Sequence, residues 1–121
     1  MSVSALHSSA FYDEVALAQS VWTIEDDAGI PAPPDSDGIR AMPFWSKSTR
    51  ALRVIENVPA YKLFRVREIP LREFVERWLP GLQVDGIRVG LNWSGARATG
   101  FDVEPDAVLA RLGKVGHAGS R

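Results

Sequence analysis

Residues 61–79 read YKLFRVREIPLREFVERWL, and the spacing of the apolar side chains changes in the middle of this stretch. Apolar and charged residues alternate in the first half, which is typical of a strand with one buried face and predicts a strand over residues 62–69. Pro70 suits the first turn of a helix. After it, apolar residues recur with helical spacing, at Leu71, Phe74, Val75, Trp78 and Leu79. The stretch therefore predicts a strand followed by an amphipathic helix, which the Pro-Gly pair at 80–81 ends.

The segments on either side predict further strands and helices in a mixed order. They are a helix over 9–19, strands over 21–24 and 39–45, a helix over 46–57, strands over 87–93 and 98–103, and a helix from 104 or 105 to 112. The strands over 87–93 and 98–103 form a hairpin. Pro43 places its strand at a sheet edge or gives it an irregular end. The order αββαβαββα predicts an α+β fold, with a mixed or mostly antiparallel sheet of about five strands and helices packed on it.

The composition predicts one soluble domain over residues 1–121, with an ordered core over 9–112 and frayed ends over 1–8 and 113–121. The 14 basic and 15 acidic residues nearly balance, which argues against a dedicated nucleic-acid binder. There is no Cys, and the two His lie near the ends of the chain, at His7 and His117. A thiolate nucleophile and a site with several Cys or His ligands are therefore not expected.

The start of the chain lacks the basic region and apolar run of a signal peptide, and no stretch has the roughly 18 apolar residues of a membrane span. We therefore expect a cytoplasmic protein without a membrane or nucleic-acid partner. The sequence predicts no cofactor, no metal and no particular oligomeric state.

The first candidate site is the start of the helix over 46–57, where Ser46 is the expected cap. Backbone N–H groups at a helix start favour an anion, and the side chains of Lys47 and Arg50 add positive charge. The hydroxyl groups of Ser46, Ser48 and Thr49 add donors, and the aromatic side chain of Trp45 lies beside them as part of the same candidate site. The alternative is an ordinary capped helix with solvated cations.

The second candidate site is the end of the strand over 87–93. Asn92 and Ser94 are expected to line the mouth of a pocket with Trp93 as its wall; the alternative is a hairpin in which these polar groups satisfy the turn backbone. Trp45 and Trp93 lie at element ends, where partial exposure is expected, whereas Trp22 and Trp78 are expected in the core.

Carboxylates do not point to a third site. The acidic residues of the loop over 25–38 have no calcium-loop spacing and are expected to be solvated, at Glu25, Asp26, Asp27, Asp35 and Asp37. No spacing singles out a pair of carboxylates for acid–base work, and no residue is assigned a catalytic role.

Several short motifs occur in a familiar order along most of the chain. They are Val21-Trp22-Thr23, Asp35-Ser36-Asp37-Gly38, Pro43-Phe44-Trp45-Ser46, Arg50-Ala51, Val58-Pro59-Ala60-Tyr61, Arg77-Trp78-Leu79-Pro80-Gly81-Leu82 and Asn92-Trp93-Ser94-Gly95. Together they resemble the bacterial family of domain of unknown function 2750, and the layout is more loosely similar to the N-terminal part of SseB-type proteins. The resemblance implies a stand-alone bacterial cytosolic domain, and it implies no activity, cofactor or catalytic residue.

The sequence thus favours a non-enzymatic binding or protein-interaction module, whose partner is a protein or a small anionic ligand. The alternative is a small enzyme that acts on an anionic substrate. The two differ in the polar content of the deepest pocket, because an enzyme needs titratable groups that converge there.

Overall fold

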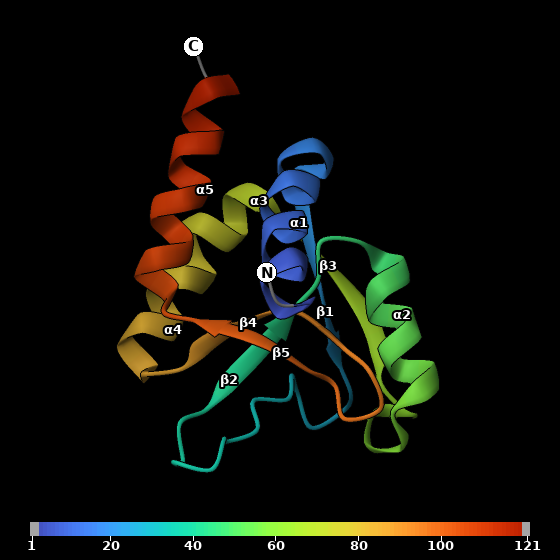
Figure 1. The fold of residues 1–121 in the computed structure, drawn as a ribbon. Coiled ribbons are helices and arrows are strands. Elements are labelled where there is room, and N and C mark those ends of the chain that lie inside the picture. Colours follow the sequence, from blue (N-terminus) through green and yellow to red (C-terminus); the bar gives the residue numbers. More distant parts are fainter. Residues whose placement is uncertain (1–2, 120–121) are drawn as a thin grey trace.

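The structure, a computed structural model, describes residues 3–119, and within them the strands form two small sheets that lie side by side (Figure 1). The strands are β1 (Ser20–Glu25), β2 (Ala41–Phe44), β3 (Arg65–Pro70), β4 (Arg88–Ser94) and β5 (Thr99–Val103). β1 pairs with β3 in antiparallel fashion, and β4 lies between β2, to which it is parallel, and β5, to which it is antiparallel. The α+β class and the hairpin of β4 and β5 are confirmed.

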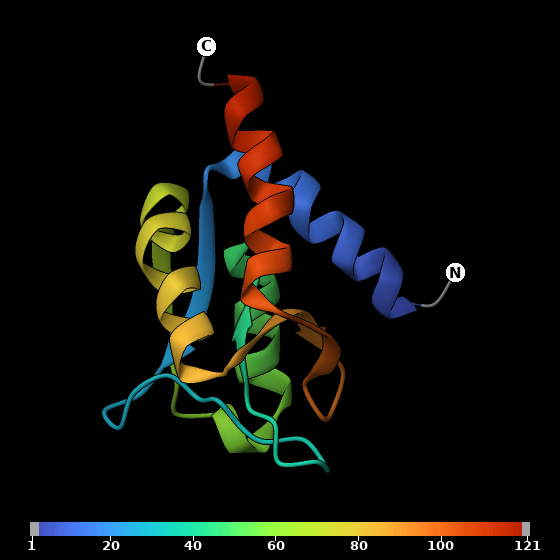
Figure 2. The same ribbon diagram turned by 90° about the vertical axis from the view of Figure 1, so that its left-hand side faces the viewer.

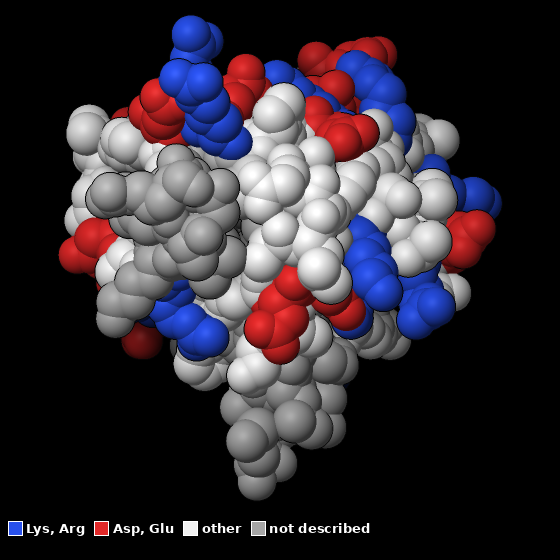
Figure 3. Space-filling view, turned by 90° about the horizontal axis from the view of Figure 1, so that it is seen from above, with Lys and Arg blue, Asp and Glu red and all other residues white. Residues whose placement is uncertain are grey.

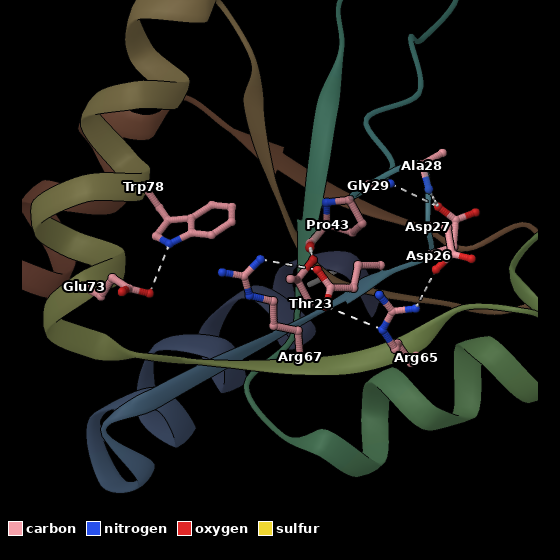
Figure 4. Close-up of polar contacts among 11 residues, drawn as sticks. Thr23, Asp26, Asp27, Ala28, Gly29, Pro43, Arg65, Arg67, Glu73 and Trp78 are labelled. Atoms are coloured by element: carbon pink, nitrogen blue, oxygen red, sulfur yellow. Dashed lines mark hydrogen bonds and ion pairs between the residues drawn. The ribbon is translucent and has the colours of Figure 1, made fainter.

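Pro43 explains why the strands divide into two sheets. One backbone pair joins β1 to the end of β2, in which the N–H groups of Trp22 and Trp45 each donate to the other residue's carbonyl at 2.8 and 2.7 Å. Pro43 has no N–H to continue that ladder, and the hydroxyl of Thr23 donates to its carbonyl at 2.7 Å instead (Figure 4). β2 is therefore the edge strand of the three-stranded sheet, as Pro43 predicts.

Helices cover both sides of the strands. They are α1 (Val3–Ala18), α2 (Ser48–Asn57), α3 (Leu71–Glu73), α4 (Leu79–Asp85) and α5 (Pro105–Gly119), with a 3-10 turn η1 (Pro59–Tyr61) and a π-helical segment η2 (Phe74–Trp78). The continuous helix made of α3, η2 and α4 lies on the opposite side of β1 from α1 (Figure 2). α1 and α5 extend into the end segments predicted to fray; that fraying stays a prediction, and residues 1, 2, 120 and 121 lie outside the described residues.

The predicted helix end at 80–81 is wrong, because the helix continues to Asp85. A π-helical turn precedes the proline, and in it the N–H of Leu79 donates to the carbonyl of Phe74. Pro80 then stands directly after this π-helical turn, in the first turn of α4, where proline is tolerated. The helix ends instead at Gly86, which takes the left-handed conformation at φ 68°.

The core comprises two clusters of buried side chains, one under α1, α5 and the helix over 71–85 and one under α2. Phe74 and Leu79 are buried in the first cluster, as the helical stripe predicts. Trp78, by contrast, is only half-buried, which corrects its expected place in the core. Its ring packs edge-on against Phe44 at 6.0 Å between centroids, and the guanidinium carbon of Arg67 lies over the indole, 5.2 Å from its centroid.

The other tryptophans also differ from expectation. Trp45 is completely buried rather than partly exposed, because it lies where the two sheets meet, and its Nε1–H donates to the carbonyl of Trp93 at 2.8 Å. Trp93 is 6% exposed, so it too is a buried side chain. Trp22, expected in the core, is half-buried beside the second cluster. Position at the end of an element is therefore a poor guide to exposure where two sheets meet.

Candidate functional site

The start of α2 is built differently from the capped helix that the sequence predicts. The helix begins at Ser48, and no side chain caps it. Ser46 is completely buried; its hydroxyl donates to the carboxylate of Glu14, and its N–H donates to Asn92 Oδ1 at 3.0 Å. Ser46 therefore links α1, the start of α2 and β4, and the prediction that it caps the helix is wrong.

Glu14, on α1, supplies an internal anion to this helix start. Its two carboxylate oxygens accept hydrogen bonds from Nε and Nη2 of Arg50, both at 2.9 Å, and Nζ of Lys47 lies 3.7 Å away. The hydrogen bonds from Arg50 lower the pKa of Glu14, with a smaller contribution from Ser46, against the raising effect of partial burial. An external anion at this helix start would compete with Glu14, and binding there stays a prediction.

A β-bulge at Asn92 carries the second group of candidate residues. Leu91 pairs with Phe101 and Ser94 with Thr99, so two residues of β4 lie opposite one residue of β5. Asn92 takes the left-handed conformation at φ 51°, which Asn tolerates better than most residues. Its Nδ2 donates to Ser46 Oγ at 3.0 Å, so the two candidate stretches meet in space.

The predicted residues line two separate hollows, except for the buried Trp45, which lines neither. The first, which we call the arginine hollow, has a volume of about 260 Å³ between α2 and the bulge; it is lined by Arg50, Arg53, Val54, Asn57, Asn92, Trp93, Ser94 and Gly95. The second, about 460 Å³, lies between the end of α1 and the start of α2; it is lined by Glu14, Leu17, Ala18, Trp22, Ser46, Lys47, Ser48 and Thr49. Of the residues expected at the helix start, Arg50 alone lines the same hollow as residues 92–94.

The arginine hollow carries positive charge that its own lining does not neutralise. Arg53 is exposed and forms no ion pair with any described residue. Arg50 presents its Nε and Nη2 to Glu14, which leaves Nη1 without a bond to the described part of the chain. Arg53 was missed in the sequence because nothing distinguishes it there from the other surface cations. Its position one turn after Arg50 on α2 is the signal that could have indicated it.

A third hollow, which we call the Asp102 hollow, was not predicted. Its volume is about 380 Å³, and it is lined by Pro33, Pro34, Asp35, Ile39, Tyr61, Trp93, Arg97, Ala98, Gly100 and Asp102. The carboxylate of Asp102 accepts a hydrogen bond from Trp93 Nε1–H at 2.8 Å. Asp102 is exposed as a whole, but partial burial of its carboxyl against the indole raises its pKa, opposed by this hydrogen bond and by Arg88.

Two glycines make room for the Trp93 indole. A Cβ at Gly90 would lie 2.3 Å from Trp93 Nε1, and a Cβ at Gly100 would lie 2.9 Å from Trp93 Cδ1. Real Cβ atoms do not approach other atoms so closely, so any side chain at either position displaces the ring. Glycines on two paired strands beside an aromatic residue are the sequence signal for this buried indole.

The acidic loop over 25–38 forms turns and ion pairs. Asp26 and Asp35 accept hydrogen bonds from the backbone N–H groups of their own turns. Asp27 lies beside Arg65 of β3 (Figure 4), and Glu25 forms ion pairs with Arg65 and Arg67. Among the described residues, no group of three or more His, Cys, Asp or Glu side chains could hold a metal ion; His7 and His117 have no described side chains.

The face of the molecule seen from above shows no field of a single sign (Figure 3). Seen from above, acidic and basic side chains alternate around an uncharged area (Figure 3). Within the part of the chain that the structure describes, no helix has the length and apolar character needed to cross a membrane. The charge of an individual hollow, such as the arginine hollow, therefore says more about a possible ligand than the net charge of the chain does.

The fold and the hollows define a small α+β domain whose polar pockets surround one bulged hairpin. The chain belongs to the family described as protein of unknown function (DUF2750), whose family model matches residues 8–112. This match includes every residue that lines the arginine hollow and the Asp102 hollow, and it confirms the family resemblance of the sequence motifs. No curated protein matches the chain.

Proposed function

We propose that this protein is a non-enzymatic binding module of the bacterial cytosol that holds a small anionic ligand in the arginine hollow. The observation that carries the proposal is that Arg53, without an ion pair among the described residues, lines the same hollow as Arg50 and the bulge residues Asn92 and Ser94. The guanidinium groups of the two arginines are the donors that a carboxylate or phosphate accepts from, and the bulge residues form the opposite, polar side of the hollow.

Charge favours an anion in this hollow. Glu14, which lies outside the lining, neutralises Arg50 from the side of α1, and Arg53 adds a further positive charge, so the two arginines and this carboxylate together carry a net charge of about +1. Two unit charges 4 Å apart interact by about 4 kcal/mol at the effective dielectric constant of a protein surface. Hydration of the ions and salt reduce the net gain, so we expect weak to moderate affinity that falls with ionic strength.

The size of the hollow limits the ligand. Drug-sized ligands occupy pockets of about 300–1,000 Å³, and the arginine hollow has about 260 Å³. This volume suits a small phosphorylated or carboxylated metabolite, or one such group of a larger ligand. The wall formed by Val54 and Trp93 supplies apolar contact beside the donors.

Binding is favoured over catalysis by the chemistry of the lining. Among the described residues that line the arginine hollow, Arg50 and Arg53 are the titratable ones. An arginine keeps its proton at neutral pH, so neither is a general acid or base. The alternative function, a small enzyme acting on an anionic substrate, would need a group that exchanges protons near the bound ligand.

The test is calorimetric titration with inorganic phosphate at fixed ionic strength, using wild type and three variants. Arg53→Gln should weaken binding by about ten- to a hundredfold, because a hydrogen bond to a charged group contributes about 1.5–3 kcal/mol. Arg72→Gln is the matched control, since Arg72 is an exposed arginine that pairs with Glu76 far along the chain from this hollow. It should bind like wild type.

Lys47→Gln separates the two possible anion sites, because Lys47 lines the hollow at the start of α2 and not the arginine hollow. A loss of binding in Lys47→Gln with none in Arg53→Gln would place the anion at the helix start and contradict the proposed location. An absence of saturable binding to wild type would contradict the anion-binding function itself and leave a protein partner as the better hypothesis.

A further inference from the structure

The Asp102 hollow has the opposite chemistry to the arginine hollow, although Trp93 lines both. Two carboxylates, Asp35 and Asp102, belong to its lining. Neither has a cationic nitrogen within 4.0 Å among the described residues. Arg88, the cation that acts most directly on Asp102, is already paired with Glu104 at 2.7 Å.

The two carboxylates repel each other across the hollow. The negative charge of Asp35 raises the pKa of Asp102, in addition to the larger effect of partial burial. Each carboxylate also has an oxygen left over: among the described residues, Oδ1 of Asp35 accepts backbone N–H groups and Oδ1 of Asp102 accepts the indole N–H, whereas Oδ2 of each has no such bond. A cation between them would relieve this repulsion and occupy the free oxygens.

The remaining walls suit an organic cation better than a metal ion. Tyr61 and Trp93 are aromatic, and Pro33, Pro34 and Ile39 are apolar. An ammonium or guanidinium group with an alkyl chain gains from aromatic faces as well as from carboxylates, whereas Ca²⁺ and Mg²⁺ need six or more oxygen ligands. The volume of about 380 Å³ is large enough for such a group with several carbon atoms.

We infer that the Asp102 hollow is a second binding site, which takes an alkylammonium or guanidinium group between Asp35 and Asp102 and against Tyr61 and Trp93. Such a group occurs on free amines and on the Lys and Arg side chains of proteins. Arg97 also lines the hollow without an ion pair to a described residue, so it opposes a cationic ligand and lowers the affinity of the site.

The experiment follows the indole Nε1–H resonance of Trp93 by NMR while the protein is titrated at constant ionic strength. n-Butylammonium chloride is the free amine, and the peptide Gly-Gly-Lys-Gly-Gly presents the same group on a chain; the peptide with acetylated lysine is the neutral control. Saturable shifts with both cations and none with the neutral peptide are expected. A shift with only one of them identifies the source of the cation, and equal shifts with the neutral peptide would overturn the inference.

Variants make the test specific. Asp102→Asn keeps an oxygen for the Trp93 N–H but removes the charge, and it should weaken binding at least about tenfold. Asp37→Asn is the matched control, because Asp37 is an exposed carboxylate of the loop over 25–38 that does not line the hollow. Arg97→Gln should tighten binding. Equal affinity in Asp102→Asn and Asp37→Asn, or no saturable binding to wild type, would show that the inference is wrong; phosphate binding in the arginine hollow is unaffected by either outcome.

The pH dependence gives an independent measurement on wild type. The groups that face Asp102 are Asp35, Arg88, Arg97 and the Trp93 N–H, and its pKa is raised above the usual range. Cation affinity should be constant near neutral pH and should fall as the pH drops through this raised pKa, because the carboxyl then loses its charge. An affinity that stays constant until well below pH 4, where an ordinary Asp titrates, would contradict the role of Asp102.

Discussion

Replacement of Glu14 by Gln tests how the start of α2 is held. Glu14 is 20% exposed in its side chain and Arg50 is 29% exposed, with two hydrogen bonds of 2.9 Å between them. An exposed ion pair contributes about 0–1 kcal/mol, and breaking a buried one costs about 3–5 kcal/mol. For this intermediate, bidentate pair we expect Glu14→Gln to lower the free energy of unfolding by about 1–2 kcal/mol at pH 7.

The dependence of this loss on pH follows from the lowered pKa of Glu14 in the folded protein. A carboxylate with a depressed folded pKa contributes stability that is fully present above its unfolded pKa and is lost as the pH falls through the folded pKa. Urea unfolding at pH 7 should therefore show a midpoint lower by about 0.5–1 M in Glu14→Gln, with an unchanged slope. At a pH below the folded pKa, the variant and wild type should be equally stable.

Asp13→Asn is the control for this experiment, because Asp13 is the neighbouring acid on α1 and is exposed. The reasoning is refuted if Glu14→Gln and Asp13→Asn lose the same stability, or if the loss in Glu14→Gln does not change between pH 7 and low pH. The variant also bears on function. With Glu14 neutral, Arg50 keeps its full charge for the arginine hollow, so phosphate affinity should rise while stability falls.

Two further predictions concern packing. Gly90→Ala should lower the free energy of unfolding by about 2–4 kcal/mol, because its Cβ would displace the Trp93 indole. Gly81→Ala is the control; it has open space around it in α4 and should raise the free energy of unfolding by about 0.5–1 kcal/mol. Equal denaturation midpoints for the two variants would contradict the close packing of the indole against Gly90. Trp78→Ala should lower the free energy of unfolding by about 1.5–3 kcal/mol, less than the roughly 3–5 kcal/mol expected for Phe74→Ala. The reason is that Phe74 is completely buried and Trp78 is half-buried. A larger loss in Trp78→Ala than in Phe74→Ala, measured by chemical denaturation, would place Trp78 in the core.

The features of the fold that depend on local periodicity could be predicted from the sequence. Alternation before Pro70 and helical spacing after it give β3 and the helix that follows, because each pattern needs one buried face. Features of the fold that depend on residues distant in the sequence could not be predicted. The π-helical turn before Pro80 and the hydrogen bond from the Thr23 hydroxyl to the Pro43 carbonyl, where the two sheets part, both become visible only in the packed chain.

Single residues of the candidate site could be predicted from the sequence, but the way they come together in space could not. Asn92 and Ser94 stand out by residue type beside a turn, and they do line a hollow. Glu14 could not be assigned, because no local pattern shows that its side chain crosses from α1 to Arg50. Trp45 was expected to be partly exposed for the same reason: the strand that pairs with its backbone comes from elsewhere in the chain.

The site of anion binding is tested most directly by a two-dimensional ¹H–¹⁵N NMR titration of the full chain with inorganic phosphate at constant ionic strength. If the arginine hollow binds the anion, saturable shifts should concentrate on the Nε–H of Arg53 and the backbone amides of Ser94 and Gly95, and they should be absent in Arg53→Gln. Shifts concentrated on the amides of Ser48 and Thr49, or no saturable shifts at all, would contradict the proposed function of the arginine hollow.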